Sequence, residues 1–355
     1  MITLLYGIRL AKKMYKVKRT IRYMGNKIKL LDFIIPEIIK YTKKDEIVCE
    51  LMAGTNSVMY ALKEKRCVYA NDIQYYSYII ANALIKNNSE TISSKKAILE
   101  LYNNYELNRK MKYFNFFVKN YSDTYFSFGQ CEEIDSIRYA IEKVNNNDRK
   151  CLYLVSLMYA MCICQSTSGH FAQYLPSDNP RLKSIREKSI FDVFLKKCDD
   201  FQDIVFNKYD NKCFNKNYID LINEKWFDKV SLVYIDPPYT TEQYSRFYHV
   251  LETVCKYDNP NLEYKGLYRT DRFNSPFSLR TQAFKEFDKL LSVLSKKNKK
   301  IVISYSTKGI VKEYELEYLI KKYFKNCKIK KTSYKHSTQG KGNIKIEELL
   351  FIAYN

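Results

Sequence analysis

An aspartate, two prolines and a tyrosine in succession, Asp236-Pro237-Pro238-Tyr239, follow a short apolar run over residues 232–235. Two consecutive prolines hold the backbone in one shape and remove two N–H donors. The loop therefore offers a carboxylate, bare carbonyl groups and one flat aromatic ring. An exocyclic amine on a planar ring complements this set, because it has two N–H hydrogens to donate and a face on which Tyr239 can stack. We predict an amine-binding loop, although an X-Pro-Pro turn can also merely end a strand.

The elements that must position this loop follow an α/β order. An apolar run over residues 47–49 leads into a turn over 53–57 and a helical stretch over 58–65, and a second apolar run over 67–70 ends in Asn71-Asp72. Strand, turn, helix, strand and acid in this order open a βαβ unit, which binds nucleotide-like ligands at the carboxyl ends of its strands.

The remaining pattern predicts further elements and an insert. Helical spacing predicts helices over 28–41, where Pro36 would kink or end the helix, and over 75–86. Residues 232–235 and 301–305 predict buried strands, and a terminal hairpin over 328–333 and 346–354, around Gly340-Lys341-Gly342, would complete the sheet. We therefore expect an extension over residues 1–17, an α/β unit over 18–85 and 211–355, and a mostly helical insert over 86–210.

The composition indicates the kind of partner. The chain has 60 lysine and arginine residues against 39 aspartate and glutamate residues, a formal net charge of +21, which favours a polyanion. The ten cysteines are scattered without a Cys-x-x-Cys pair, and the three histidines lie far apart, so we expect reduced thiols and no metal site. We find no secretion signal and no apolar run of the roughly 20 residues that span a membrane. A cytoplasmic protein without a membrane partner is expected.

Taken together, these motifs resemble the Dam-like, or alpha-group, DNA adenine-N6 methyltransferases, including those that accompany restriction enzymes. The resemblance covers roughly residues 18–85 and 213–355, and the insert falls where that group carries its target-recognition domain. It implies a doubly wound, mostly parallel, seven-stranded Rossmann-like sheet with a mostly helical recognition insert. It also implies S-adenosyl-L-methionine as the cofactor and double-stranded DNA as the partner, and it leaves open a restriction endonuclease that acts separately.

The resemblance assigns roles to two loops and two single residues. Residues 23–27, Tyr-Met-Gly-Asn-Lys, resemble the motif that brackets the methyl donor and the flipped base. Residues 50–57 resemble the first donor-binding motif, with Met52 in place of the usual phenylalanine and Asn56 in place of a second glycine; asparagine tolerates a left-handed φ better than most residues. Asp72 would accept the ribose hydroxyls or cap the next helix. The implied cofactor contacts are Tyr23, Gly25, Lys27, Glu50, Met52, Gly54, Thr55, Asp72 and Asn217, the last standing near the place of the group's usual acid.

The DNA contacts are expected from two segments. After the catalytic loop, Tyr244 and Arg246 belong to a segment similar to one in related restriction-associated enzymes, in which Phe247 and Tyr248 would pack into the core. In the insert, His170 and Arg181 are polar enough to read base edges or bind phosphate. One sequence does not select among the polar residues of the insert.

The resemblance implies that Asp236, Pro237, Pro238 and Tyr239 form the catalytic loop, with Asp236 and the Pro237 carbonyl holding the amine of a flipped-out adenine. Three alternatives stay open. An RNA adenine methyltransferase would use the same loop, although the long insert argues against it. A protein-glutamine methyltransferase usually begins this loop with asparagine. A catalytically weakened DNA-binding relative would account for the departures at Asn56 and Asn217.

Overall fold

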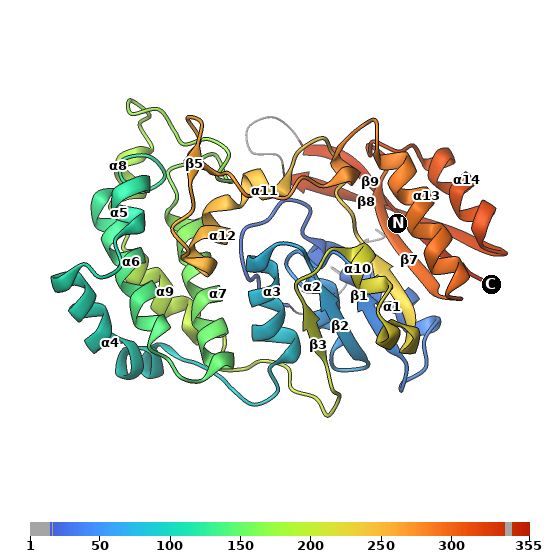
Figure 1. The fold of residues 1–355 in the computed structure, drawn as a ribbon, viewed down its shortest axis with the longest axis horizontal. Helices are drawn as coiled ribbons and strands as arrows, with labels where there is room; N and C mark the ends of the chain where they lie inside the picture. Colours follow the sequence, from blue (N-terminus) through green and yellow to red (C-terminus); the bar gives the residue numbers. More distant parts are fainter. Residues whose placement is uncertain (1–14, 16, 338–342) are drawn as a thin grey trace, which may run out of the picture.

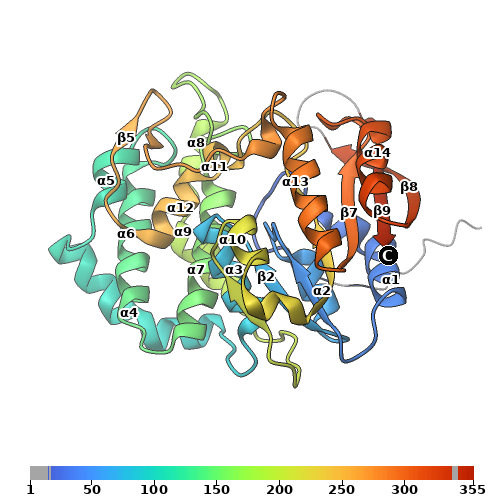
Figure 2. The ribbon, with the colours of Figure 1, turned by 45° about the vertical axis from the view of Figure 1, so that its right-hand side comes forward.

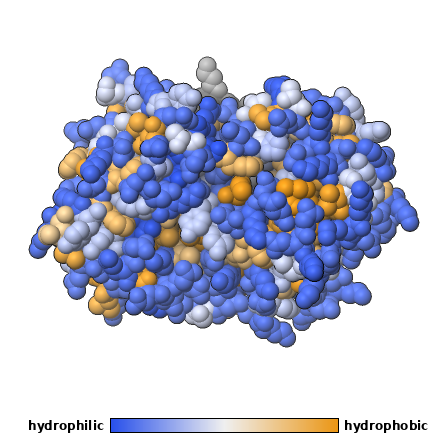
Figure 3. All heavy atoms as spheres, viewed as in Figure 1, coloured by the Kyte–Doolittle hydropathy of each residue, from blue (hydrophilic) through white to orange (hydrophobic). Residues whose placement is uncertain are grey.

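The computed structural model describes residues 15, 17–337 and 343–355. Most of the expected N-terminal extension and the Gly340-Lys341-Gly342 turn lie outside the described residues. The chain forms two lobes side by side, a helical lobe and a lobe built around a sheet (Figures 1 and 2). The face drawn in Figure 3 is largely hydrophilic, with apolar residues scattered over both lobes.

A seven-stranded sheet in the order β3-β2-β1-β4-β7-β9-β8 forms the core of the second lobe. The first five strands of this order pair in parallel, and β9 pairs antiparallel with both β7 and β8. This arrangement confirms the predicted α/β class and the terminal hairpin that completes the sheet. The strands are β1 (Ile47–Glu50), β2 (Cys67–Asn71), β3 (Lys212–Phe214), β4 (Val230–Ile235), β7 (Lys300–Ser306), β8 (Asn326–Ser337) and β9 (Asn343–Tyr354).

Helices cover both faces of the sheet, which is why its central strands are apolar along their whole length. Leu232 and Tyr234 of β4 pack in the cluster that includes the first three helices, whereas Val233 and Ile235 pack in the cluster of the opposite face. The first face is covered by η1 (Lys27–Leu30), α1 (Leu31–Lys40), α2 (Ser57–Leu62) and α3 (Tyr75–Ala81). The opposite face is covered by α10 (Tyr218–Ile222), η3 (Lys225–Lys229), η4 (Pro276–Ser278), α13 (Ala283–Lys296) and α14 (Glu313–Tyr323).

Two predicted helices differ in detail from the structure. Helix α1 continues through Pro36 to Lys40, so this proline does not end it. The predicted helix over 75–86 changes after Ala81 into the π-helical turn η2 (Asn82–Lys86). The buried ammonium of Lys63 donates hydrogen bonds to the carbonyls of Leu84 and Asn87 at 2.9 and 2.6 Å, and so satisfies the end of this turn.

The helical lobe contains the predicted insert and a later segment of the chain. Its insert helices are α4 (Ser94–Met111), α5 (Phe116–Tyr121), α6 (Phe128–Glu142), α7 (Asn147–Cys164), α8 (Leu182–Arg186) and α9 (Ile190–Asp199). The segment that follows the Asp236 loop adds α11 (Tyr244–Phe247), α12 (His249–Lys256), β5 (Leu262–Glu263) and β6 (Tyr268–Arg269). Hydrogen bonds attach it to the insert, because Tyr257 Oη donates to Asp135 at 2.6 Å and Tyr125 Oη donates to the Gly266 carbonyl at 2.8 Å.

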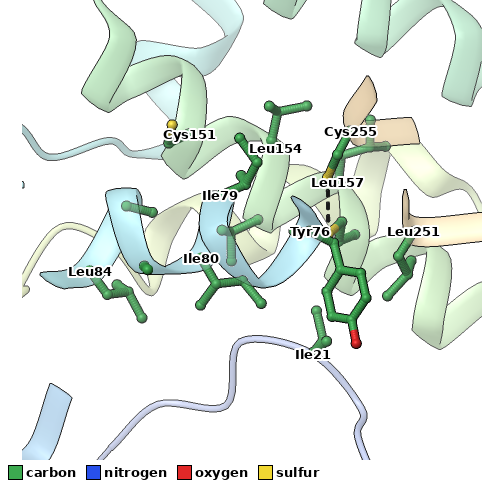
Figure 4. Close-up of a cluster of buried hydrophobic side chains, with 14 of the residues drawn as sticks. Ile21, Tyr76, Ile79, Ile80, Leu84, Cys151, Leu154, Leu157, Leu251 and Cys255 are labelled. Carbon is green, nitrogen blue, oxygen red and sulfur yellow. Dashed lines mark hydrogen bonds between the residues drawn. The ribbon is translucent and has the colours of Figure 1, made fainter. Parts of the chain in front are cut away.

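A continuous apolar cluster joins the two lobes. Tyr76 and Ile80 of α3 face Leu154 and Leu157 of α7 and Leu251 of α12 (Figure 4). Within this cluster the Cys255 thiol lies 3.4 Å from the Met158 sulfur. Since α3 follows β2 directly, this packing fixes the helical lobe against the carboxyl ends of the strands.

Two further findings bear on possible partners. No helix within the described part of the chain is long and apolar enough to cross a membrane. Among the same residues, no group of three or more histidine, cysteine, aspartate or glutamate side chains is arranged to hold a metal ion.

Candidate active site

A pocket of about 990 Å³, its mouth included, opens at the carboxyl ends of β1, β2 and β4. Its lining includes four loops, residues 23–27, 50–55, 72–74 and 236–239, and side chains from residues 216–218, 243–245 and 273–277. Parallel strands bring their carboxyl ends to one edge of a sheet, and this edge is where α/β enzymes bind ligands. The loops that the sequence marked as chemical therefore meet in one place.

The Asp236 side chain lines this pocket and shares a cation with a second acid. Lys27 Nζ lies 3.0 Å from Asp236 Oδ1 and 2.8 Å from Glu348 Oε1. Lys27 and Glu348 are almost fully buried, whereas Asp236 keeps 19% of its side chain exposed. Burial raises the pKa of Asp236 to about 6, with Lys27 lowering it and Glu348 raising it further.

Local backbone chemistry positions Lys27. Gly25 has a φ of +74°, and a Cβ at this residue would lie 3.1 Å from the Tyr244 hydroxyl, so the turn requires glycine. Asn26 then accepts the Ile28 N–H at 2.8 Å and caps the short helix η1 that begins at Lys27. The turn and the cap together direct the lysine under the Asp236 loop.

The turn after β1 is bound to the acid after β2. Asp72 Oδ2 accepts the Gly54 N–H and Asp72 Oδ1 accepts the Gln74 N–H, both at 2.8 Å. The same carboxylate thus faces the pocket and the start of α3. Asn56 has a φ of 59°, so asparagine fills the position of the second glycine in the left-handed conformation expected from the sequence.

Two buried acids, Asp72 and Glu50, line the pocket beside the turn after β1. Burial raises the pKa of Asp72 to about 6. Burial also raises the pKa of Glu50 well above its ordinary value, and the nearby Asp236 and Asp72 raise it further. Glu50 Oε2 has no hydrogen-bond partner among the described residues. Buried carboxyl groups of this kind suit a ligand that brings its own positive charge and hydroxyl donors.

Aromatic rings form the wall beside these acids. Tyr23 stacks on Tyr248 with the ring centroids 4.5 Å apart, and Tyr244 lies 5.2 Å from the same ring. A Cβ at Gly54 would lie 3.3 Å from the Tyr23 ring, so that ring also rests on the turn after β1. Lys27 Nζ lies 5.4 Å from the centroid of the Tyr239 ring.

The structure brings most of the predicted residues together. The pocket is lined by Tyr23, Gly25, Lys27, Glu50, Met52, Gly54, Thr55, Asp72, Asn217, Asp236, Pro237, Pro238 and Tyr239. Asn217 also accepts the Ile219 N–H at 3.2 Å and so caps α10. Asp220, the acid nearest to it in sequence, is exposed on α10.

The four predicted DNA contacts lie in different surroundings. Tyr244 lines the pocket rather than the outer surface. Arg246 is ion-paired with Glu242, and His170 stacks on Phe247 with ring centroids 4.0 Å apart. Arg181 is exposed just before α8. Phe247 and Tyr248 are buried, as the sequence predicted.

Sequence reasoning missed three side chains that support the site. Glu348 of β9 binds Lys27, and Tyr248, between α11 and α12, stacks on Tyr23. Glu252 of α12 accepts the N–H groups of Tyr75 and Tyr76 at 3.1 and 3.0 Å. The one signal for Glu348 is an acid that directly precedes the apolar residues 349–353. Glu252 gave no signal, because an acid in an amphipathic helix is ordinary.

Comparisons with known proteins agree with this geometry. Residues 23–319 match the family described as D12 class N6 adenine-specific DNA methyltransferase. The chain is 30% identical over 298 residues to the modification methylase LlaI of Lactococcus lactis subsp. lactis. The aligned region covers 80% of the chain and 46% of LlaI. It is 29% identical over 309 residues to the type II methyltransferase M.FokI of Planomicrobium okeanokoites. This aligned region covers 81% of the chain and 44% of M.FokI.

A relative of similar length also matches. The chain is 26% identical over 352 residues to the type II methyltransferase M2.HphI of Haemophilus parahaemolyticus. The aligned region covers 94% of the chain and 97% of M2.HphI. The chain therefore spans less than half the length of LlaI and M.FokI, and nearly all of M2.HphI. Because the family match extends over most of the chain and includes every residue that lines the pocket, the chain belongs to the D12 class of N6 adenine-specific DNA methyltransferases.

Proposed function

We propose that the protein is a site-specific DNA methyltransferase that transfers a methyl group from S-adenosyl-L-methionine to the N6 amine of an adenine flipped out of duplex DNA. The observation that carries the proposal is a single pocket in which the Asp236 loop faces the loops after β1 and β2. One side of the pocket has the groups to hold an amine, and the other has acids for a ligand with a positive charge and hydroxyls.

The residues of this pocket fit the methyl donor. The unpartnered Glu50 Oε2 suits the ammonium of the donor's methionine part, and Asp72 suits its ribose hydroxyls. Gly54 lets the backbone approach closely, and Asn217 can meet the adenine ring of the donor. When bound, the donor supplies a sulfonium methyl group, which is already a strong electrophile.

The Asp236 loop would then orient the acceptor nitrogen. Asp236 and the Pro237 carbonyl accept the two amine hydrogens, and Tyr239 stacks on the base. Accepting both hydrogens shifts the nitrogen lone pair away from the ring and toward the electrophile. No covalent enzyme intermediate is needed, so catalysis consists mainly of positioning and electrostatics.

The helical lobe would bind the DNA. We assign residues 86–210 to target recognition and residues 18–85 and 211–355 to catalysis, with the segment over α11, α12, β5 and β6 supporting the recognition part. Support comes from the hydrogen bonds that attach this segment to the insert helices. A net charge of +21 suits a duplex backbone, and it makes binding salt-dependent. A restriction endonuclease that acts separately is part of the proposal, because relatives bear the name modification methylase.

The test is to express the chain in a methylation-deficient bacterium and to sequence its genome by a method that detects N6-methyladenine. Methylation at one short motif is expected, and the Asp236→Ala variant should abolish it. Persistence of the signal in that variant would refute the role of Asp236. If the wild-type genome stays unmodified while the protein binds the donor in calorimetry, the substrate is RNA or protein. Failure of both measurements would indicate a weakened DNA-binding relative.

A further inference from the structure

The C-terminal strand contributes an acid that does not line the pocket. We propose that Glu348 of β9 is a positioning residue, which holds the Lys27 ammonium so that Lys27 engages one oxygen of Asp236 and leaves the carboxylate directed at the acceptor amine. The proposal rests on the proposed function, because it assigns Glu348 a role in the methyl-transfer site.

The geometry separates Glu348 from the ligand. The side chain of Glu348 is 0% exposed, that of Lys27 is 3% exposed and that of Asp236 is 19% exposed. Lys27 and Asp236 line the pocket, whereas Glu348 lies behind them. Glu348 therefore reaches the reacting groups only through the lysine, which lies 2.8 Å from its Oε1.

Glu348 is itself held in place by the sheet. Its Oε1 accepts a hydrogen bond of 2.5 Å from Ser304 Oγ on β7. The backbone registers Glu348 opposite Ser306 of β7 and Thr332 of β8, so two neighbouring strands fix its position. A lysine stem has four rotatable carbons. Glu348 therefore holds the ammonium from a paired strand of the sheet, whereas Asp236 contacts it from a loop.

The burial of Glu348 argues that the arrangement serves the site. The next five residues of β9 are apolar and buried, from Leu349 to Ala353. A buried charge in such a strand is often less stable than a hydrophobic residue of similar size. The cluster also has two acids for one lysine. The cost is compensated if the cluster directs the Asp236 carboxylate.

The charges around Asp236 make this proposal measurable. Asp236 faces Lys27 from η1, Glu348 from β9 and Glu50 from β1, together with the hydroxyls of the nearby tyrosines Tyr234, Tyr239 and Tyr244. Among these groups, Glu348 raises the pKa of Asp236 and Lys27 lowers it. Removing the Glu348 charge should therefore lower the pKa of Asp236 and move the acidic limb of the activity profile to lower pH.

The decisive comparison uses two adjacent acids. Glu348→Gln keeps the shape of the side chain and removes its charge, and Glu347→Gln makes the same change at the neighbouring exposed residue. Both variants are assayed on a duplex that carries the methylated motif. We expect Glu348→Gln to lower kcat by about tenfold or more, to change the KM for the donor by less than about threefold, and to shift the acidic limb downward. Glu347→Gln should match the wild type in all three.

A double-variant cycle shows whether Glu348 acts through Lys27. In a Lys27→Gln background, Glu348→Gln should cause no further loss of kcat, because the group that it positions is gone. An equal loss in both backgrounds overturns the proposal. If Glu348→Gln does not fold, Ser304→Ala, which removes only the hydroxyl that holds Glu348, should show the same shift of the acidic limb in weaker form. A Ser304→Ala profile identical to the wild type then overturns the proposal.

One readout does not depend on methylation. The carboxyl ¹³C shift of Asp236, assigned by comparison with Asp236→Asn, gives its pKa in the unliganded protein. A lower value in Glu348→Gln than in Glu347→Gln supports the proposal, and equal values overturn it. Absence of methylation by the wild type would refute the proposed function, while this titration would still decide the role of Glu348.

Discussion

The backbone N–H of Gly54 donates a hydrogen bond of 2.8 Å to Oδ2 of Asp72, which joins the turn after β1 to the acid after β2. The other oxygen of Asp72 accepts the Gln74 N–H at the start of α3. One carboxylate thus fixes two loops of the pocket. These two hydrogen bonds join the Asp72 carboxylate to backbone groups at the pocket edge. Removing this carboxylate should therefore weaken ligand binding more than it destabilises the core.

We predict that Asp72→Ala weakens donor binding by about tenfold or more, roughly 1.4 kcal/mol, because two backbone donors lose their acceptor and the ribose loses its own. Isothermal calorimetry with S-adenosyl-L-methionine measures the change. Asp220→Ala is the matched control, since Asp220 is exposed on α10 and lies outside the pocket. Equal affinities for the two variants would contradict the assigned role of Asp72.

Replacing Gly25 by alanine should impair the site through backbone strain. The φ of +74° is unfavourable for alanine, and the added Cβ would press on the Tyr244 hydroxyl at 3.1 Å. We expect a loss of stability of about 1–2 kcal/mol and a larger loss of activity, because the strain displaces Lys27. Urea unfolding and methylation kinetics measure both effects.

The control for that variant is Gly129→Ala. Gly129 lies in α6, and a Cβ there would meet nothing within 4 Å. Alanine favours a helix over glycine by roughly 1 kcal/mol, so this variant should be as stable as the wild type or more stable. If both glycine variants behave alike, the left-handed turn at Gly25 does not matter.

The activity should fall in acid as Asp236 takes up a proton. Burial raises the pKa of this carboxyl to about 6. Below that pH the protonated carboxyl is a weaker acceptor for the amine hydrogen that Asp236 would hold, so kcat should fall by about tenfold per pH unit. A rate profile at saturating DNA and donor, with folding followed by circular dichroism at each pH, measures the limb. A flat profile down to about pH 4.5 would contradict an essential Asp236 carboxylate.

The same pKa has the opposite consequence for stability. The folded pKa of about 6 is higher than the ordinary value of 3.8, so folding favours the protonated group. Its contribution is fully present below the unfolded pKa and is lost as the pH rises through about 6. Asp236→Asn removes this dependence, so the variant should gain stability over the wild type by about 1–2 kcal/mol at neutral pH, after allowance for partial solvent access.

Urea unfolding of the unliganded proteins near pH 4 and near pH 7.5 tests this relation. The advantage of Asp236→Asn should be small at the lower pH and grow with increasing pH. An advantage that shrinks as the pH rises would mean that Lys27 holds the pKa of Asp236 below its ordinary value. Catalytic sites commonly carry such a stability cost.

Binding to duplex DNA should depend on Arg181. This side chain is exposed on the helical lobe, before α8. If it contacts one phosphate, Arg181→Ala should lower the slope of log affinity against log salt by about one. Lys321→Ala removes the same charge from α14 on the sheet lobe and should leave the slope unchanged. A wild-type slope for Arg181→Ala would exclude a phosphate contact at this residue.

The chemistry-bearing loops could be predicted because their signals are local. Asp236-Pro237-Pro238-Tyr239 restricts its own backbone, Gly25 and Gly54 mark left-handed turns, and Asp72 follows an apolar strand. Parallel strands bring such loops to one edge without further information. The terminal hairpin could likewise be predicted, because two strand-like stretches of the sequence, residues 328–333 and 346–354, lie on either side of a glycine-containing segment.

Other features depended on contacts between distant residues. Nothing near Tyr244 in the sequence distinguishes a pocket wall from an outer surface. In the fold its ring lies 5.2 Å from the ring of Tyr23, and both residues line the pocket. The attachment of the segment over α11, α12, β5 and β6 to the helical lobe results from hydrogen bonds between residues more than one hundred positions apart, such as Tyr257 and Asp135. The spacing of apolar residues along a helix does not predict which distant residues form such hydrogen bonds.

The sequence by itself determined the α/β order of elements and marked the Asp236-Pro237-Pro238-Tyr239 loop and the acids Glu50 and Asp72, all of which line the pocket. Each of these signals depends on residues within a few positions of one another. Only the tertiary structure decided that Lys27 lies between Asp236 and Glu348. That ion cluster joins η1, the loop after β4 and the final strand. Its geometry arises from strand register across the whole sheet, which side-chain alternation in one strand does not specify.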